Sequence, residues 1–327
     1  MASLVKVGFI GAGGIAKAHA DALTRVPDVQ IAAVTDASPQ AAQEMAEKTG
    51  AKVFPSASAL ARDSGVQALF ILLPPFAHGE AEKAALESKL PFFIEKPVGL
   101  DVSFLQEMAA EIEKNNLMTC AGYMNRYRKS VNTARDLLQK EPPVLAFGGW
   151  WGGTPGNHPW WIEKDKSGGQ FHEQVTHTVD IARYLMGEPE EVYCAAAHGF
   201  NKGIPRYTMD DAATVVIRFK AGGIANLMSS VTSNAGGRVF LDLNSLNRNF
   251  HFTDWEHNLV ITEKGGEKQE IKGEPDIFAV EDAVFVQAVR SGDRSHIRSS
   301  YADAVKSAAL SLAANVSLET GRPVSVA

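Results

Sequence analysis

The stretch VGFIGAGGIA, residues 7–16, joins a run of apolar residues to a helical pattern through a glycine-rich turn. Its spacing is G-x-G-x-x-A, with Gly11, Gly13 and Ala16 at the three fixed positions. Gly11 permits a tight turn, Gly13 lets a pyrophosphate approach the backbone, and Ala16 lets the helix pack closely on the strand. Free N–H groups at the start of the helix face the phosphate charge. The stretch therefore predicts a dinucleotide-binding unit.

The next strand-like run, IAAVTD, ends in Asp36, twenty residues after Ala16. An acid at this place binds the ribose hydroxyls of the adenosine half of a dinucleotide. The alternative is a turn residue that leads into a helix at Ser38. Ala37 follows Asp36 with no adjacent arginine to receive a 2′-phosphate, which favours NAD over NADP. The cofactor contacts predicted from this unit are Gly11, Ala12, Gly13, Gly14, Ile15 and Asp36.

The apolar pattern divides the chain into two parts. From Leu4 to about Tyr123, short apolar runs alternate with helical patterns, which predicts a doubly wound parallel sheet of the Rossmann type. After this, strand patterns with glycine-rich turns predict a C-terminal α+β domain with a large, mainly antiparallel sheet. Three helical patterns accompany it, at 168–187, 278–291 and 302–320. We expect an NAD-binding domain over 1–124 and a substrate-binding and oligomerisation domain over 125–327.

Composition limits the classes of partner. The chain has 327 residues and a net charge of −6, which argues against nucleic acid, and no basic run suggests a membrane surface. The amino terminus resembles neither a signal peptide nor a membrane span. Cys120 and Cys194 are the only cysteines, and no Cys, His, Asp or Glu cluster has metal-ligand spacing. We expect a cytoplasmic protein without a metal.

The segment FFIEKPVG, residues 92–99, ends an apolar run with a charged pair and a proline. In an open parallel sheet, ligands bind outside the carboxyl ends of the strands. Lys96 follows such a strand and is therefore expected on the cofactor side. The alternative is a surface lysine in a turn.

An EKP sequence at a strand end, after a GxGxxA unit, resembles the Gfo/Idh/MocA oxidoreductases, which include glucose–fructose oxidoreductase and inositol dehydrogenases. The resemblance covers nearly the whole chain. It implies that Lys96 lies beside the nicotinamide and contacts the reacting substrate hydroxyl, and that Glu95 and Pro97 of the same turn contact the cofactor. The segment LPPFAHGE resembles the family's TPNxxH, although Pro75 replaces the asparagine. The resemblance implies that Leu73 and Pro74 line the nicotinamide side, and we expect His78 to start a helix rather than act as a catalyst.

The family's second hallmark is a GGGxLxDxGxH helix, and this chain has SGGQFHEQVTH at 167–177. Glu173 stands where aspartate is usual, and His177 matches the histidine. At a spacing of four residues the two would share one helical face, where a carboxylate and an imidazole can handle a proton. The alternative for His177 is a core histidine. Asp180 is a candidate for substrate binding or for a structural hydrogen bond.

Two further segments are candidates for substrate contact. AGYMNRYR places Tyr123, Asn125 and Arg126 after the last strand of the first domain, with interdomain packing as the alternative. The loop WWGGTPGNHPWW carries Trp160 and Trp161, which would stack on a sugar face or cover a sheet edge or an oligomer contact.

Taken together, these features predict an NAD(P)-dependent oxidoreductase that transfers hydride between the nicotinamide and a secondary alcohol or ketone of a sugar, inositol or related polyol. The predicted catalytic residues are Lys96, His177 and Glu173. An NAD-dependent glycoside hydrolase of the same family and a non-catalytic NAD-sensing regulator are the alternatives. We expect a homodimer or homotetramer that forms through the C-terminal sheet.

Overall fold

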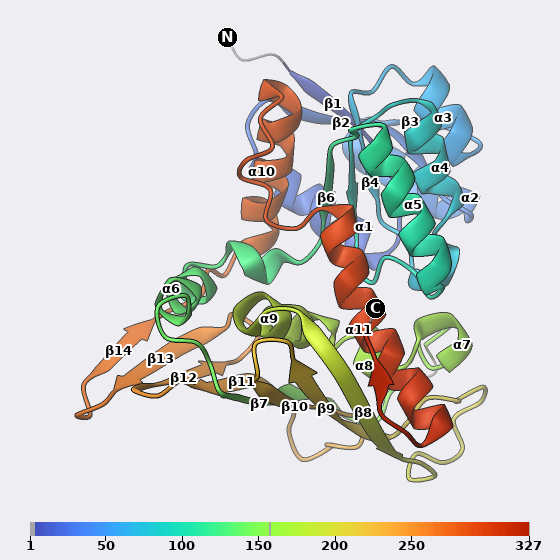
Figure 1. The fold of residues 1–327 in the computed structure, drawn as a ribbon. Coiled ribbons are helices and arrows are strands. Elements are labelled where there is room, and N and C mark those ends of the chain that lie inside the picture. Colours follow the sequence, from blue (N-terminus) through green and yellow to red (C-terminus); the bar gives the residue numbers. More distant parts are fainter. Residues whose placement is uncertain (1–3, 157, 327) are drawn as a thin grey trace. The chain divides into compact units, whose positions relative to one another are not determined.

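The computed structural model describes residues 4–156 and 158–326 (Figure 1). The chain divides into two compact units. The first runs to Met124 and includes Asp276–Val305, and the second comprises Asn125–Pro275 and the chain from Lys306 onward. The sequence predicts that the first domain ends at residue 124 and that all later residues belong to the second. The structure differs from this prediction because Asp276–Val305 returns to the first unit.

The first unit is built on a six-stranded parallel sheet in the order β3-β2-β1-β4-β5-β6. The chain leaves β1 toward one edge of the sheet and returns to β4 on the other side of β1, which is the doubly wound arrangement. The predicted Rossmann sheet is confirmed. The strands are β1 (Val5–Ile10), β2 (Val29–Thr35), β3 (Lys52–Val53), β4 (Ala68–Ile71), β5 (Phe92–Ile94) and β6 (Thr119–Ala121).

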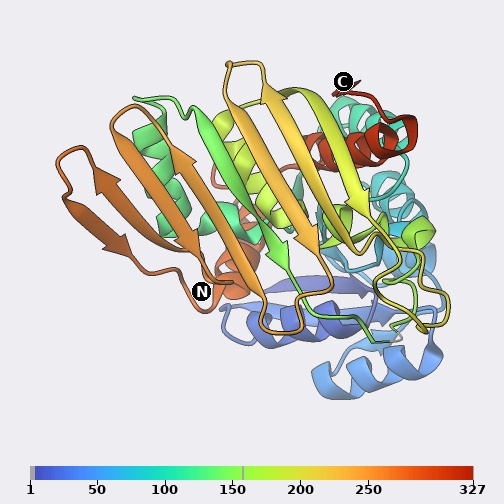
Figure 2. The ribbon, with the colours of Figure 1, turned by 90° about the horizontal axis from the view of Figure 1, so that it is seen from below.

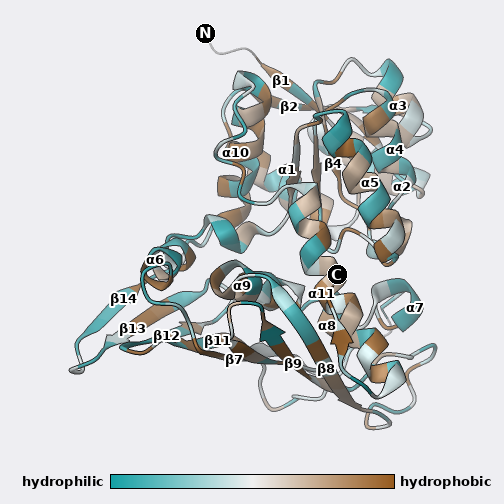
Figure 3. Cartoon of the chain, in the orientation of Figure 1, coloured by the Kyte–Doolittle hydropathy of each residue, from teal (hydrophilic) through white to brown (hydrophobic). Residues whose placement is uncertain are grey.

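Helices cover both faces of this sheet, with α1 and α10 on one face and α4 and α5 on the other (Figure 1). In α5 the buried residues are Leu105, Met108 and Ile112, which form one apolar stripe, and Figure 3 shows hydrophilic and hydrophobic residues alternating around this helix. The helices are α1 (Gly14–Leu23), α2 (Pro39–Thr49), α3 (Ala57–Asp63), α4 (Glu80–Glu87), α5 (Val102–Lys114) and α10 (Ile277–Ser291), with the short turn η1 (Pro75–Ala77).

Helix α10 belongs to the first unit because its apolar side packs on the parallel sheet. The Phe285 ring lies 5.4 Å from that of Phe70 in β4, in an edge-to-face arrangement. Phe278 meets the ring of His19 in α1 at 5.3 Å. A helical pattern alone shows which face is apolar but not which sheet that face will cover.

The second unit contains a nine-stranded sheet in the order β14-β13-β12-β11-β7-β10-β9-β8-β15. Neighbouring strands are antiparallel except for β7 and β10, which are parallel. The mainly antiparallel α+β domain is confirmed. The strands are β7 (Leu145–Trp151), β8 (Pro189–Ala197), β9 (Ala212–Phe219), β10 (Ile224–Ser230), β11 (Arg238–Asn244), β12 (Arg248–Thr253), β13 (Asn258–Glu263), β14 (Lys268–Ile271) and β15 (Val324–Ser325).

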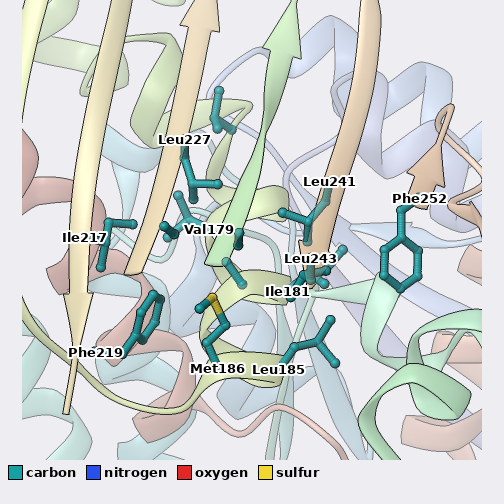
Figure 4. Packing of buried hydrophobic residues seen from close by; sticks show 14 of the residues in the cluster. Val179, Ile181, Leu185, Met186, Ile217, Phe219, Leu227, Leu241, Leu243 and Phe252 are labelled. Atoms are coloured by element: carbon teal, nitrogen blue, oxygen red, sulfur yellow. The ribbon is translucent and has the colours of Figure 1, made fainter. Parts of the chain in front are cut away.

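Helices cover one face of the large sheet, and Figure 2 shows the other face open. On the covered side, Val179 and Leu185 of α9 pack against strand residues such as Ile217 and Leu241 (Figure 4). Residues therefore alternate along β9 between buried and exposed positions. The helical elements are η2 (Met124–Tyr127), α6 (Lys129–Leu138), α7 (Lys164–Ser167), α8 (Gln170–Glu173), α9 (Thr176–Met186) and α11 (Tyr301–Thr320).

Candidate active site

The glycine-rich turn lies between the end of β1 and the start of α1. Gly11 has a φ of +104°, and a Cβ added there would come within 2.3 Å of the Leu72 carbonyl oxygen, so only glycine fits. Gly13 and Gly14 are exposed, and an added Cβ on either would meet nothing within 4 Å. Helix α1 has no side-chain cap at Gly13, which leaves its first N–H groups open to a ligand. This cradle fits a dinucleotide pyrophosphate.

Asp36 follows β2 and lies against the cradle. Its Oδ2 accepts a hydrogen bond of 2.7 Å from the N–H of Ala12, and its Oδ1 accepts one of 2.7 Å from the N–H of Ser38. Ser38 in turn caps α2. The acid therefore serves the turn, as the alternative proposed, and also lies beside the glycine loop. Each carboxylate oxygen has a second lone pair with which to accept a ribose hydroxyl.

Lys96 and Glu95 both follow β5, but they differ in burial. Lys96 is half-buried, whereas Glu95 is only 2% exposed. Glu95 Oε2 accepts from the backbone N–H of Lys96 at 3.1 Å, and Oε1 lies 3.0 Å from His19 Nε2. The Glu95 carboxylate thus faces the interior of the first unit.

The predicted cofactor residues lie at one edge of the parallel sheet. The carboxyl ends of parallel strands share an edge. Gly11, Asp36, Leu73 and Glu95 follow β1, β2, β4 and β5, respectively. Pro74 follows Leu73, and both are half-buried, whereas Pro97 is buried. Ile15 lies in the first turn of α1.

His78 lies just before α4 and interacts with that helix. Its Nδ1 lies 2.8 Å from Glu82 Oε1, and Glu82 Oε2 also accepts from the N–H of Gly79. The residue therefore belongs to the start of a helix, as expected from the sequence.

The second unit carries Glu173 and His177, but not on one continuous helix. The pattern predicted a single helix over 168–187, and this is wrong, because the chain breaks between α8 and α9. The N–H of Val175 bonds to the carbonyl of Gln170, five residues back, and the ladder resumes at Val179 with a bond to Val175. This one-residue shift rotates the two segments relative to each other.

The break gives Glu173 and His177 different neighbours. Glu173 Oε2 accepts a 2.6 Å hydrogen bond from the indole Nε1 of Trp161. His177 is 5% exposed, and its ring stands edge-on to Trp255 at 5.6 Å. The Glu173 carboxylate therefore fixes Trp161 of the predicted aromatic loop, while the His177 imidazole contacts Trp255 edge-on.

Asp180 forms a buried ion pair with Arg126. Arg126 donates from Nε to Asp180 Oδ2 at 2.8 Å and from Nη2 to Oδ1 at 2.6 Å. Ser307 Oγ adds a third bond to Oδ1 at 2.7 Å. Both charged residues are no more than 3% exposed. This arrangement matches the structural alternative for Asp180, and it brings together two residues that were separate candidates in the sequence.

The remaining candidates occupy packed positions. Tyr123 is buried in the first unit, and Asn125 is buried in the second, where its Oδ1 accepts from Arg128 Nε at 2.7 Å. Trp161 packs against the cluster of Ile162, Met209 and Val231. Trp160 is half-buried, has a φ of +63°, and meets the ring of His158 at 5.7 Å.

Two buried residues of the first unit escaped the sequence reasoning: His19 and Asp282, which contact each other. One signal was available for His19. It falls on the same face of α1 as Ala16, Ala20 and Leu23, all of them buried. A histidine in an apolar stripe needs a polar partner. No pattern in the sequence identifies that partner as a residue 263 positions away.

Over residues 4–156 and 158–326, the structure has no group of three or more His, Cys, Asp or Glu residues that could hold a metal ion. In the same part of the chain, no helix is long and apolar enough to cross a membrane.

A phosphate cradle, an acid beside it and a lysine at a neighbouring strand end share one edge of a doubly wound sheet. This arrangement defines a dinucleotide-binding protein of the Rossmann type. A family model described as "Oxidoreductase family, NAD-binding Rossmann fold" matches residues 5–123, and one described as "GFO/IDH/MocA C-terminal domain" matches residues 144–244. The chain belongs to the Gfo/Idh/MocA family, which confirms the resemblance, and it is an NAD-dependent oxidoreductase.

Similar proteins span almost the whole chain. Myo-inositol 2-dehydrogenase of Thermotoga maritima is 27% identical over 334 residues, covering 98% of this chain and 98% of the relative. The scyllo-inositol 2-dehydrogenase (NAD(+)) of Bacillus subtilis is 25% identical over 337 residues, covering 98% and 96%. The crystal structure of a "probable dehydrogenase from Thermotoga maritima" matches with a TM-score of 0.82 and 25% identity, covering 98% of this chain and 99% of that one.

Proposed function

We propose that the protein oxidises a secondary alcohol of an inositol, sugar or related polyol with NAD, or reduces the corresponding ketone. The observation that carries the proposal is the placement of Lys96 after β5, on the same sheet edge as the glycine cradle and Asp36. The inositol dehydrogenases among the relatives support a polyol as the substrate class.

When bound, NAD supplies the hydride acceptor, and the protein's own residues manage the proton and the orientation of the substrate. His177 takes the proton of the reacting hydroxyl, because an imidazole changes charge near neutral pH and is the commonest general base. Lys96 hydrogen-bonds the same oxygen and stabilises the negative charge that develops on it. A secondary alcohol loses hydride easily only when its proton leaves in step, so both residues belong to the chemical step.

Glu173 acts on the substrate through Trp161. Its carboxylate holds the indole N–H at 2.6 Å, which fixes the ring plane of Trp161. A fixed indole ring offers a flat apolar face against which the C–H face of a polyol or sugar can stack. The other candidates for substrate contact occupy buried or half-buried positions: Tyr123, Asn125, Arg126, Trp160 and Asp180.

We propose NAD rather than NADP as the physiological cofactor. Asp36 is half-buried, accepts two backbone N–H groups, and would repel a 2′-phosphate at the ribose. Ala37 offers no positive charge to compensate.

We also propose that the protein forms a homodimer or homotetramer through the open face of the large sheet, in the cytoplasm. Phe147 and Val216 face the open side in one cross-strand row, and Leu145 and Ile224 form the next. All four are exposed. Exposed apolar side chains on one open sheet face mark an interaction surface, and two copies of one face satisfy each other by symmetry. Both cysteines are buried thiols, as suits a reducing compartment.

A panel of inositols, aldoses and polyols, each incubated with NAD, tests the proposal through NADH formation. Net NADH with at least one polyol supports it. Cleavage of a glycoside without net NADH would instead indicate the hydrolase alternative, and tight NAD binding without any turnover would indicate the regulator.

A further inference from the structure

A chain of three buried ionisable side chains lies behind Lys96 in the first unit. His19 comes from α1, Asp282 from α10, and Glu95 follows β5, and each is no more than 2% exposed. His19 Nδ1 lies 2.9 Å and 3.1 Å from the two oxygens of Asp282. His19 Nε2 lies 3.0 Å from Glu95 Oε1.

The geometry indicates that His19 is an imidazolium. An ionised carboxylate only accepts hydrogen bonds, so with Asp282 and Glu95 both ionised each ring nitrogen of His19 carries a proton. Burial alone lowers the pKa of His19, but the charges and hydrogen bonds of Asp282 and Glu95 outweigh it and hold the pKa well above 6.5. Burial raises the pKa of Asp282, and the opposing attraction of His19 limits this rise.

Aromatic rings contact the His19 ring in addition to the carboxylates at its nitrogens. It stands edge-on to Phe93 of β5 at 5.0 Å and to Phe278 of α10 at 5.3 Å. A ring packed in this way has one orientation available, so its two N–H bonds point in fixed directions.

Glu95 is confined in the same manner. Its backbone N–H bonds to Ile71 of β4, and a Cβ added to Gly122 would come within 2.6 Å of Glu95 Oε1. Its second oxygen, Oε2, accepts the backbone N–H of Lys96 at 3.1 Å. The position of the Lys96 backbone therefore depends on the orientation of one carboxylate, and that orientation depends on His19.

The same chain of contacts reaches the phosphate cradle. His19 lies five residues after Gly14, on the helix whose first turn forms the cradle. A buried cluster of charged residues is weak evidence for a gain in stability, because hydrophobic residues of similar volume often stabilise a fold equally well. Its better-supported role is to specify one conformation of the chain.

We propose that Asp282, His19 and Glu95 are positioning residues that hold Lys96 in register with the cofactor cradle. The inference rests on the proposed function, because Lys96 must act in the chemical step for its position to matter. Misplacing a reacting group by about 1 Å can cost about 10²-fold in rate. Loss of the chain of contacts should therefore reduce the rate of the chemical step and leave the cradle's affinity for NAD unchanged.

The test compares E95A with E95Q. A glutamine can offer its carbonyl to the Lys96 N–H and its amide to a neutral His19, so both contacts survive in E95Q. We expect kcat to fall about 10-fold or more in E95A and to stay within about 3-fold of wild type in E95Q, with the Kd for NAD unchanged in both. An equal loss of kcat in E95A and E95Q would show that the charge of Glu95 itself is required. Wild-type kcat in both variants would show that the Glu95 side chain does not affect the chemical step. Either result would overturn the proposal.

A second comparison uses two histidines of the same unit, each in contact with a buried carboxylate. A glutamine at position 19 can reach Glu95 or Asp282 but not both, so H19Q should lose about 10-fold in kcat. H78Q is the matched control, because His78 also contacts a buried carboxylate, that of Glu82, but at the start of α4. It should keep wild-type kcat. Wild-type kcat in a folded H19Q enzyme would overturn the proposal, and if H19Q does not fold, the comparison at Glu95 decides.

Coupling to Lys96 separates this inference from the proposed function. In a K96A background, E95A should add less than about 2-fold to the loss, since there is no longer a lysine side chain to position. An added loss of about 10-fold would mean that Glu95 acts independently of Lys96. If K96A itself keeps wild-type turnover, the proposed function of Lys96 fails, whereas a loss in K96A alone, with E95A unaffected, defeats only the positioning role.

Discussion

The buried ion pair between Arg126 and Asp180 gives a prediction with a magnitude set by the structure. Asp180 accepts two bonds from Arg126 and one from Ser307. Replacing Asp180 by Asn keeps the shape but removes the carboxylate charge that faces the buried guanidinium of Arg126. Removing one partner of such a pair costs about 3–5 kcal/mol.

Thermal unfolding measures this cost. For a domain of the size of the second unit, 1 kcal/mol corresponds to about 2–4 °C, so D180N should lower Tm by about 6–20 °C. S307A removes one neutral donor and should cost about 1 kcal/mol. The double variant R126M/D180L replaces the charges with apolar groups and should recover most of the stability lost in D180N.

The opposite pattern would refute this reasoning. If Asp180 binds substrate instead, D180N would keep the wild-type Tm and raise KM for the polyol, and R126M/D180L would be no more stable than D180N.

Four other predictions follow from particular residues and their contacts. Asp36 should make NAD bind at least about 10-fold tighter than NADP, or about 1.4 kcal/mol, and equal affinities in a titration of both cofactors would remove Asp36 from the ribose site. E173A and W161F each break the indole–carboxylate bond and should raise KM for the polyol about 10-fold, from about 1.5 kcal/mol for a charged hydrogen bond, and an unchanged KM would separate Trp161 from the substrate. Burial lowers the pKa of His257 to about 4, so the unfolded chain binds a proton at this residue more readily than the folded chain does. The free energy of unfolding should therefore decrease by about 3 kcal/mol in total as pH falls from 6.5 to 4. In urea unfolding H257Q should flatten that slope, and an equally steep slope in H257Q would assign it to other groups. The pKa of His19 is raised instead, so its contribution is complete below pH 6.5 and is lost as pH rises through the folded-state pKa, and a wild-type alkaline slope in H19Q would contradict this.

Local chemistry made much of the first unit predictable. The turn at Gly11 requires a positive φ and close approach to Leu72, and Asp36 follows a strand that must be parallel to the first. Both features depend on neighbouring residues or on one βαβ unit, so they leave a pattern in the sequence. The same holds for Lys96, because the end of a buried strand fixes its side of the sheet.

Long-range packing explains what the sequence did not reveal. Helix α10 joins the first unit because Phe285 packs against Phe70 of β4. The periodicity of apolar residues in the sequence does not identify that pairing. The break between α8 and α9 shifts one hydrogen bond at Val175, although the apolar pattern of the segment stays helical. Nothing near Glu95 in the sequence indicates the partner of its buried carboxylate, which is a histidine 76 residues away.

The central claim is that hydride moves directly between a polyol carbon and NAD with the help of Lys96 and His177. The most direct measurement supplies a polyol that carries deuterium on its carbinol carbon and follows the label by mass spectrometry. The account predicts that the deuterium appears in the reduced nicotinamide of the wild-type enzyme, and that K96A and H177A each form this product about 10²-fold more slowly while binding NAD as tightly. Reduced cofactor without the label, or wild-type rates in either variant, would contradict it.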